Sequence, residues 1–285
     1  MSSVLFILSL FLALAKCFRV PVSRNSYNIP SIEVRVLNGF VNSTVRLDLN
    51  LYRVNRLPAR IETAFDNHFE FQLGDGVAFN ATVRGNTDGF HGKLGVGPSS
   101  TLLSRFGSVG IFSNELFLNM TQLEFASRCV AESIVTIPIV DGGTSYDTPG
   151  SVSFGTLSRG WIDMSIQYPP LWLPSEVFYQ LIDVLRNSGV EWNSLLPDRL
   201  SNCTLGAINL LPDLRINFED RQTLLVSPSD FIIHDQETNI CAFHIRRVIG
   251  YGTAVVAPLA LRGINVYIAD GSSEMSLCDD ASVVG

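Results

Sequence analysis

The stretch IEVRVLNGFVNSTVRLDLNL, from Ile32 to Leu51, alternates apolar and polar residues along most of its length. A period of two places the apolar side chains on one face of a β-strand. Asn38-Gly39 interrupts the alternation, and this dipeptide favours the tight turn of a β-hairpin. The stretch therefore predicts two paired strands that share one buried face.

The same pattern recurs further along the chain. FEFQLGDGVAFN, from Phe69 to Asn80, alternates around Gly74-Asp75-Gly76 and predicts a second hairpin. The segment 175–187 instead carries apolar residues at helical spacing, and Gly189 follows its end. The 22 Gly, 13 Pro and 18 Phe favour many short strands and turns. We expect an all-β fold with a few short helices.

Composition limits the possible classes of protein. With 285 residues, 46% hydrophobic and 16% charged, the chain can bury a sizeable core as one large domain or two small lobes. Its formal net charge is -7, whereas binding of nucleic acid requires a basic surface. Nucleic acid is therefore not an expected partner.

The N-terminus resembles a secretory signal. An apolar run from Val4 to Ala15 ends in Ala13-Leu14-Ala15, which has the small residues of a cleavage site. The run is short for a membrane span, and no later segment is long and apolar enough to form one. We expect a signal peptide at residues 1–17 and no membrane anchor after its cleavage. The mature chain would be secreted or lie in the lumen of the secretory or endolysosomal pathway.

The cysteines and sequons fit that compartment. Cys129, Cys203, Cys241 and Cys278 form an even set, which allows three disulfide pairings, while Cys17 lies beside the cleavage site. No Cys-x-x-Cys occurs and the histidines at 68, 91, 234 and 244 lack ligand spacing, so neither a metal nor another cofactor is expected. Expected glycosylation sites are Asn42, Asn80, Asn119 and Asn202.

Five segments carry a family resemblance through their order in the chain. They are GKLGVGPSS (92–100), GSVSFG (150–155), Leu-Pro followed by the predicted helix (173–187), LPDLRINF (211–218) and NVYIAD (265–270). Together they resemble the pepsin-like aspartic peptidases, and the cysteine pattern is nearest to the beta-secretase branch. The resemblance implies a two-lobed pepsin-like fold with shortened lobes, at 18–155 and 156–285. It also implies disulfides between Cys203 and Cys241 and between Cys129 and Cys278.

The family's chemistry requires two aspartates that share one proton, one acting as base and the other as acid. Asp48, in Val-Arg-Leu-Asp-Leu-Asn, stands where the family has its first Asp-Thr-Gly. Asn50 replaces the glycine that lets backbone N–H groups approach the carboxylates. In the second lobe the expected position holds Ser165, and the nearest acid is Asp163, two residues earlier.

Asp141 is a further candidate partner. It begins Asp-Gly-Gly-Thr-Ser, the best second motif in the chain, but it precedes the 150–154 segment that closes the first lobe. Asp-Gly is also a strong hairpin signal, and we favour that interpretation. Leu73 replaces the tyrosine of the family's flap, and Val255-Val-Ala257 replaces the hydrophobic pair and glycine behind the second aspartate.

These substitutions predict a catalytically degenerate peptidase homologue that retains a cleft for a peptide or protein ligand. We expect Asp48 on a loop between the lobes, with Leu73 on a hairpin that could cover it. The alternative is an active aspartic endopeptidase that uses Asp48 with Asp163 or Asp141. A second alternative is a secreted β-rich protein that shares only the sequence pattern.

Overall fold

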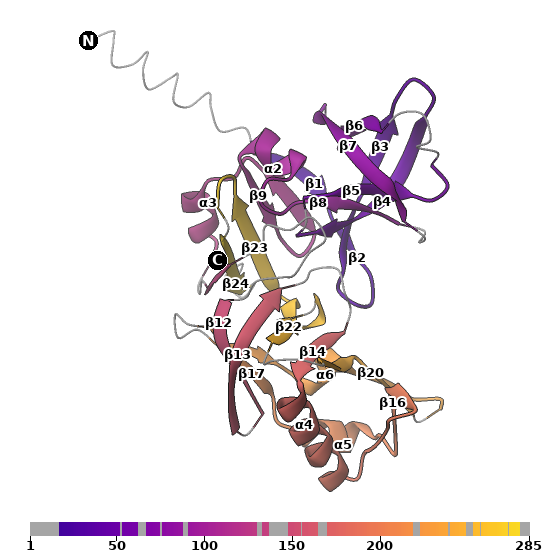
Figure 1. Cartoon of the computed structure of the whole chain (residues 1–285), viewed down its shortest axis with the longest axis vertical. Helices are drawn as coiled ribbons and strands as arrows, with labels where there is room; N and C mark the ends of the chain where they lie inside the picture. The colour runs from indigo at the N-terminus through magenta and orange to yellow at the C-terminus, as the bar shows by residue number, and fades with distance from the viewer. Residues whose placement is uncertain are drawn as a thin grey trace, which may run out of the picture. The chain divides into compact units, whose positions relative to one another are not determined.

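The structure is a computed structural model, shown in Figure 1. The residues that it describes are 17–51, 53–61, 67–74, 76–87, 91–129, 133–136, 148–154, 156–164, 170–218, 223–238, 240–248, 253–256, 258–272 and 274–279. The predicted signal peptide lies almost entirely outside these residues. Within them, no helix has the length and apolar character that crossing a membrane would require.

The chain divides into two compact units. The first consists of residues 1–23, 31–132 and 264–285, and the second of residues 24–30 and 133–263. This division differs from the expected boundary at residue 155. The last strands join the first unit because Val266 pairs with Ile111, and residues 150–153 join the second because Val152 pairs with Ile216.

The first unit is built mainly of strands. Its elements are β1 (Phe18–Pro21), β2 (Ser23–Arg24), β3 (Pro30–Leu37), β4 (Asn42–Asn50), β5 (Asn55–Pro58), β6 (His68–Gln72), β7 (Ala78–Thr87), β8 (Gly92–Gly95), α2 (Thr101–Phe106), β9 (Ser108–Ile111), β10 (Glu115–Leu118), α3 (Gln122–Ala126), β23 (Ile264–Ala269) and β24 (Glu274–Asp279). One sheet has the order β2-β3-β4-β8-β5-β7-β6, and another contains β1-β10-β9-β23-β24.

Both predicted hairpins of the first unit are confirmed. β3 pairs with β4 in antiparallel register, with Val34 opposite Val45, and β6 pairs with β7 around the Gly74–Gly76 turn. The Asn38 side chain accepts hydrogen bonds from the backbone N–H groups of Phe40 and Val41, which closes the first turn. The alternating apolar residues are buried as expected.

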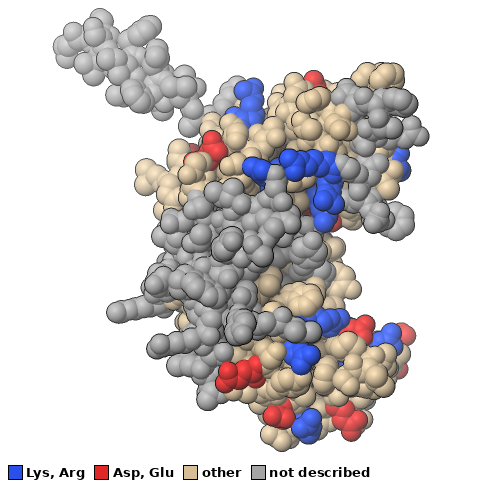
Figure 2. All heavy atoms as spheres, viewed as in Figure 1, with Lys and Arg blue, Asp and Glu red and all other residues tan. Residues whose placement is uncertain are grey.

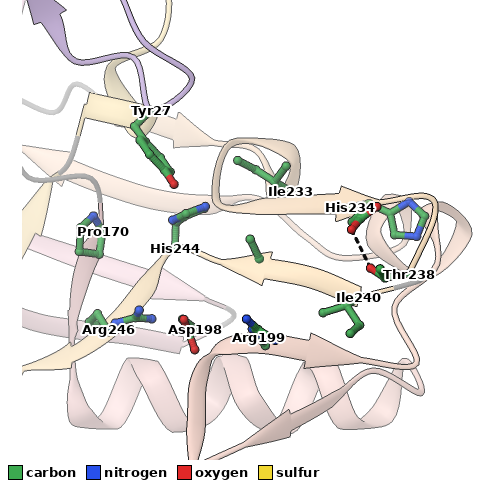
Figure 3. A pocket seen from close by; sticks show the side chains of 12 residues that line it. Tyr27, Pro170, Asp198, Arg199, Ile233, His234, Thr238, Ile240, His244 and Arg246 are labelled. Carbon is green, nitrogen blue, oxygen red and sulfur yellow. Dashed lines mark hydrogen bonds between the residues drawn. The ribbon is translucent and has the colours of Figure 1, made fainter.

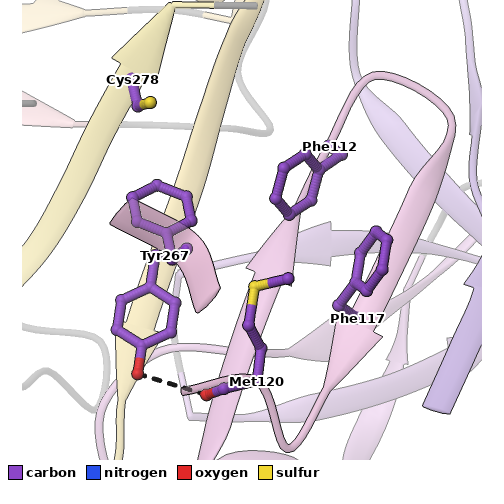
Figure 4. Close-up of a cluster of buried hydrophobic side chains, with 6 residues drawn as sticks. Phe112, Phe117, Met120, Tyr267 and Cys278 are labelled. Atoms are coloured by element: carbon purple, nitrogen blue, oxygen red, sulfur yellow. Dashed lines mark hydrogen bonds between the residues drawn. The ribbon is translucent and has the colours of Figure 1, made fainter. Parts of the chain in front are cut away.

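A cluster of buried hydrophobic side chains packs the last two strands onto the rest of the first unit (Figure 4). Phe112, Phe117, Met120 and Phe125 pack with Tyr267 of β23 and Cys278 of β24. The Tyr267 hydroxyl donates to the Met120 carbonyl at 3.3 Å. The predicted Cys129–Cys278 disulfide is present beside this cluster, so packing and a covalent bond hold the same strand pair.

The second unit contains sheets and the longest helix. Its elements are β11 (Ser133–Thr136), β12 (Thr148–Phe154), β13 (Thr156–Met164), β14 (Leu171–Pro174), α4 (Ser175–Asn187), β15 (Glu191–Asn193), β16 (Leu196–Ser201), α5 (Leu205–Asn209), β17 (Leu214–Phe218), β18 (Thr223–Val226), α6 (Pro228–Phe231), β19 (Ile232–Asp235), β20 (Ile240–Phe243), β21 (Ile245–Val248), β22 (Thr253–Val256) and the 3-10 helix η1 (Pro258–Leu261). The sheet orders are β18-β17-β12-β13-β22-β14-β21 and β15-β16-β20-β19.

Two predictions for this unit are confirmed. α4 spans Ser175–Asn187 and buries one apolar face, because Val177, Phe178 and Leu181 lie at helical spacing. The Cys203–Cys241 disulfide is also present, and it joins the segment that follows β16 to β20.

Each unit contains the same three-strand arrangement. In the first, β8 lies between β4, to which it is parallel, and β5, to which it is antiparallel. In the second, β22 lies between β13, again parallel, and β14, again antiparallel. Residues at corresponding register positions of the two motifs are therefore structural equivalents, whatever their spacing in the sequence.

Candidate functional site

Asp48 lies inside strand β4, not on the expected loop. Its backbone is opposite Ser31 of β3 and Lys93 of β8, and the pairing with β8 continues to Asn50. Leu47 and Leu49 are buried, whereas Arg46 and Asp48 are partly exposed. The alternation therefore directs the Asp48 side chain away from the core that Leu47 and Leu49 enter.

The Asp48 carboxylate contacts a histidine. Its Oδ1 atom is 3.2 Å from Nδ1 of His91, and the two side chains are 20% and 38% exposed. Burial raises the pKa of Asp48, and this effect outweighs the lowering by His91, Arg46 and Lys93. In the sequence His91 lacks the spacing of a metal ligand, and no other role is expected for it. Its place just before the Gly92–Ser100 segment was the available signal.

Further cationic side chains lie on the same face of the sheet. Lys93 is directly opposite Asp48 on one side and Arg56 on the other, so these three residues form a row across β4, β8 and β5. Burial lowers the pKa of Lys93, as does Arg56, while Asp48 opposes the shift. Lys and Arg side chains gather over these strands in Figure 2. The surroundings of Asp48 are therefore predominantly positive.

Asn50 is accommodated without a glycine at this position. It is only 2% exposed and lies opposite Gly95, and its carbonyl accepts a hydrogen bond from the Val96 N–H. The Asn55 side chain accepts from the Gly95 N–H at 3.1 Å, which ties β8 to β5. Asn50 is thus part of the hydrogen-bonded strand.

A close approach of two chain segments fixes this motif. A Cβ atom on Gly97 would lie 1.5 Å from the carbonyl oxygen of Leu51. Only glycine allows the chain that leaves β8 to pass the chain that leaves β4 at this distance. The glycine-rich segment 92–100 therefore has a structural reason for its composition.

The second motif identifies a counterpart of Asp48. In the first unit, Lys93 pairs with both Asp48 and Arg56. In the second, Val255 pairs with both Asp163 and Trp172. Strand register therefore gives Asp163 the position that Asp48 has in the first motif, whereas counting back from Leu173-Pro174 gives Ser165. Ser165 and Asp141 both lie outside the described residues.

The predicted flap residue has a buried side chain. Leu73 lies at the β6–β7 turn, where its N–H donates to the Val77 carbonyl. Gly74 and Gly76 have φ values of 95° and 78°, which suit glycine in a tight turn. Because Leu73 is only 3% exposed, its side chain belongs to the core of the first unit and offers no polar group.

The remaining site residues are on or near the surface. Three of the four sequon asparagines, Asn42, Asn80 and Asn202, are exposed, and Asn119 is partly buried. Within the described part of the chain, no cluster of His, Cys, Asp and Glu could hold a metal ion.

Comparison with known proteins identifies the architecture. No protein-family model matches the chain, and neither does any curated protein. Among solved structures, the chain is similar to the crystal structure of an aspartic proteinase from Irpex lacteus. The TM-score is 0.68 at 15% sequence identity, over 94% of this chain and 99% of that chain. The chain therefore has the two-lobed fold of the pepsin-like aspartic proteinases.

Proposed function

We propose that this chain is a secreted, glycosylated pepsin-like peptidase homologue that binds a peptide or protein segment in a retained cleft and is catalytically degenerate. The fold and the two disulfides support a homologue adapted to an oxidising compartment. The sequons and the N-terminal apolar run support passage through the secretory pathway.

The contact between Asp48 and His91 is the observation that carries the proposal of degeneracy. A carboxyl dyad works in acid because two nearby carboxylates share one proton. His91 Nδ1 lies 3.2 Å from Asp48 Oδ1, so the histidine would compete with the attacking water for the Asp48 carboxylate. Arg46 and Lys93 add further positive charge beside Asp48, although burial outweighs it and leaves the pKa of Asp48 raised.

An active endopeptidase is the second candidate, and the strand register favours it. If Asp163 completes the pair, one carboxylate would act as general base toward water and the other would protonate the leaving amine. The register supports Asp163 as this partner, because it occupies the position equivalent to Asp48. Asp141 stays an open alternative from the sequence.

The two functions are separated by an assay of the purified mature protein on mixed peptides at about pH 3 to 5, where carboxyl dyads operate. Asp48→Asn, Asp163→Asn and Asp141→Asn are compared with the exposed control Asp183→Asn. We expect no turnover, and binding of a statine-type transition-state mimic that Asp48→Asn weakens.

Statine-sensitive turnover that is lost in Asp48→Asn and in one other variant would refute degeneracy and identify the partner residue. The loss would be about 10² to 10⁴-fold for each positioned acid or base. Absence of both turnover and mimic binding would refute the retained cleft.

A further inference from the structure

The second unit has an open pocket unrelated to Asp48 (Figure 3). Its volume is about 750 Å³, within the range of ligand sites, and every residue that lines it belongs to the second unit. Three of the lining residues, Tyr27, Ile233 and Ile240, are large apolar side chains that are 37%, 38% and 37% exposed. The pocket thus gathers apolar surface that the unit leaves in contact with solvent.

Strand alternation gives the pocket the form of a groove. Ile240 and Ala242 of β20, His244 and Arg246 lie at every second position along the chain, and all four line it. At about 3.3 Å per residue, the part of the row from Ile240 to His244 extends roughly 13 Å, and Arg246 follows on β21, which belongs to the other sheet. We call this row and its flanking residues the β20 groove. The extended part of the row matches about four residues of an extended peptide.

The two strands beside β20 contribute different side chains to the groove: β19 contributes an apolar residue and β16 a charged one. Ala242 lies opposite Ile233 of β19 and opposite Arg199 of β16. Ile240 lies opposite Asp235. Ile233, Ala242 and Ile240 therefore form a continuous apolar patch, and Arg199 lies beside its middle.

The groove is lined by two carboxylates, Asp198 and Asp235, and two guanidinium groups, Arg199 and Arg246, which differ in how fully they are engaged. The Arg246 guanidinium donates to the carbonyls of Pro197, Phe243 and Ile245. The Asp235 carboxylate accepts from Thr238 and from the Glu237 N–H. Arg199 is exposed, and within the described part of the chain its guanidinium has no hydrogen-bond or ion-pair partner. Arg199 is the cation that is available to a ligand.

An unsatisfied group lies at the other end. The His244 ring meets the Tyr27 ring edge to face, with centroids 5.1 Å apart, and its Nε2 atom is buried without a partner among the described residues. Buried polar atoms are normally hydrogen-bonded, so this atom is an exception within the described residues. The Asn28 side chain holds the Tyr27 segment by donating to the Pro258 carbonyl at 2.6 Å.

We propose that the β20 groove binds an extended acidic peptide segment of another protein. One apolar side chain of the peptide packs at the Ile240 end of the apolar patch, and an acidic side chain two positions away pairs with Arg199. Side chains two apart on a strand face the same way at about 6.6 Å spacing, which matches the offset between Ile240 and the Ala242–Arg199 row. A carboxylate suits Arg199 because guanidinium binds it with two parallel hydrogen bonds. This proposal is independent of the function assigned to Asp48.

The test uses fluorescein-labelled hexapeptides with Leu and Glu two positions apart, in both orders, and matched peptides with Gln or Lys for Glu and Ser for Leu. Fluorescence anisotropy measures their binding to the full mature protein. We expect the Leu-Glu peptides to bind in at least one order. Replacement of Glu by Gln should weaken binding about tenfold, as for loss of a charged hydrogen bond.

Protein variants give the matched arm of the experiment. Arg199→Glu should weaken the Glu peptide and favour the Lys peptide, whereas Arg215→Glu, an exposed arginine on β17, should leave both unchanged. Ile240→Ser should weaken all Leu peptides, and the exposed Leu225→Ser on β18 should not. Asp48→Asn should not change binding of these peptides. Loss of groove binding can therefore be distinguished from failure of the function proposed for the Asp48 site. Circular dichroism verifies folding of each variant.

The proposal is overturned if no peptide binds at about 1 mM, the weakest affinity of interest here. It is equally overturned if the Glu and Gln peptides bind alike, or if Arg199→Glu behaves as Arg215→Glu does.

Discussion

Removal of the Cys203–Cys241 disulfide should destabilise the second unit by an amount that follows from its loop. The two cysteines are separated by 38 residues and both are fully buried. In the chain-entropy model, cross-linking a loop of this length reduces the unfolded-state entropy by a term worth about 3.9 kcal/mol at 25 °C. Loss of two buried sulfur atoms in Cys203→Ala/Cys241→Ala adds a cost of the same sign.

Tryptophan fluorescence provides a selective assay. The chain has three tryptophans, at positions 161, 172 and 192, and all three belong to the second unit. With a urea m-value of about 2 kcal/mol/M, a loss of 3.9 kcal/mol lowers the midpoint of the fluorescence transition by about 2 M. The matched control is Cys129→Ala/Cys278→Ala, which removes the disulfide of the first unit. It should affect the far-ultraviolet circular dichroism transition more than the fluorescence transition.

An unchanged fluorescence midpoint in Cys203→Ala/Cys241→Ala would refute the reasoning, provided that mass spectrometry shows the wild-type bond. So would a larger fluorescence shift in the control variant, because the first unit contains no tryptophan.

Three further predictions concern single positions. Because the folded-state pKa of Asp48 is raised above its usual 3.8, the wild type loses stability as pH rises through the window from 3.8 to the raised value. The stability of Asp48→Asn relative to wild type should therefore increase from about pH 3 to pH 7, and a flat difference in urea unfolding would contradict this. Gly97→Ala should cost about 4 kcal/mol or more or prevent folding, because its Cβ would overlap Leu51, and near wild-type thermal stability would disprove the close approach. Thr204 caps α5 and completes the Asn202 sequon. Thr204→Ala should therefore remove any Asn202 glycan, and it should lower the free energy of unfolding of the deglycosylated protein by about 1 kcal/mol. Thr204→Ser should keep both, as unfolding curves and glycopeptide mass spectra can verify.

Local pattern predicted the elements well where side-chain period and turn chemistry agree. The alternation of residues 32–51, the Asn38 turn and the 175–187 helix all appear in the structure because each depends on neighbouring residues. The disulfides followed from the family resemblance, since the spacing of the cysteines alone left three pairings open. Placement of Asp48 on a loop was wrong because the pairing of β4 with β8 depends on residues more than 40 positions away.

The site was harder to predict than the fold for the same reason. The contact of His91 with Asp48 spans 43 positions, and its one signal in the sequence is the place of His91 just before the Gly92–Ser100 segment. The second-lobe counterpart also depends on a long-range pairing, that of Asp163 with Val255. Counting back from Leu173-Pro174 to the second aspartate assumes a fixed loop length, whereas the register between β13 and β22 does not depend on that length.

The two repeated motifs have the same backbone and different chemistry across the row. In the first, Asp48 is paired with Lys93, which is paired with Arg56, so the row carries one negative and two positive groups. In the second, the corresponding partners of Asp163 are Val255 and Trp172, neither of which carries a charge. Symmetric motifs suit a proton shared between equivalent carboxylates, whereas here the cations favour ionisation of Asp48 and its burial opposes it. The asymmetry therefore lies in the charges that surround Asp48, and the duplicated strand framework holds its position whether or not catalysis survives.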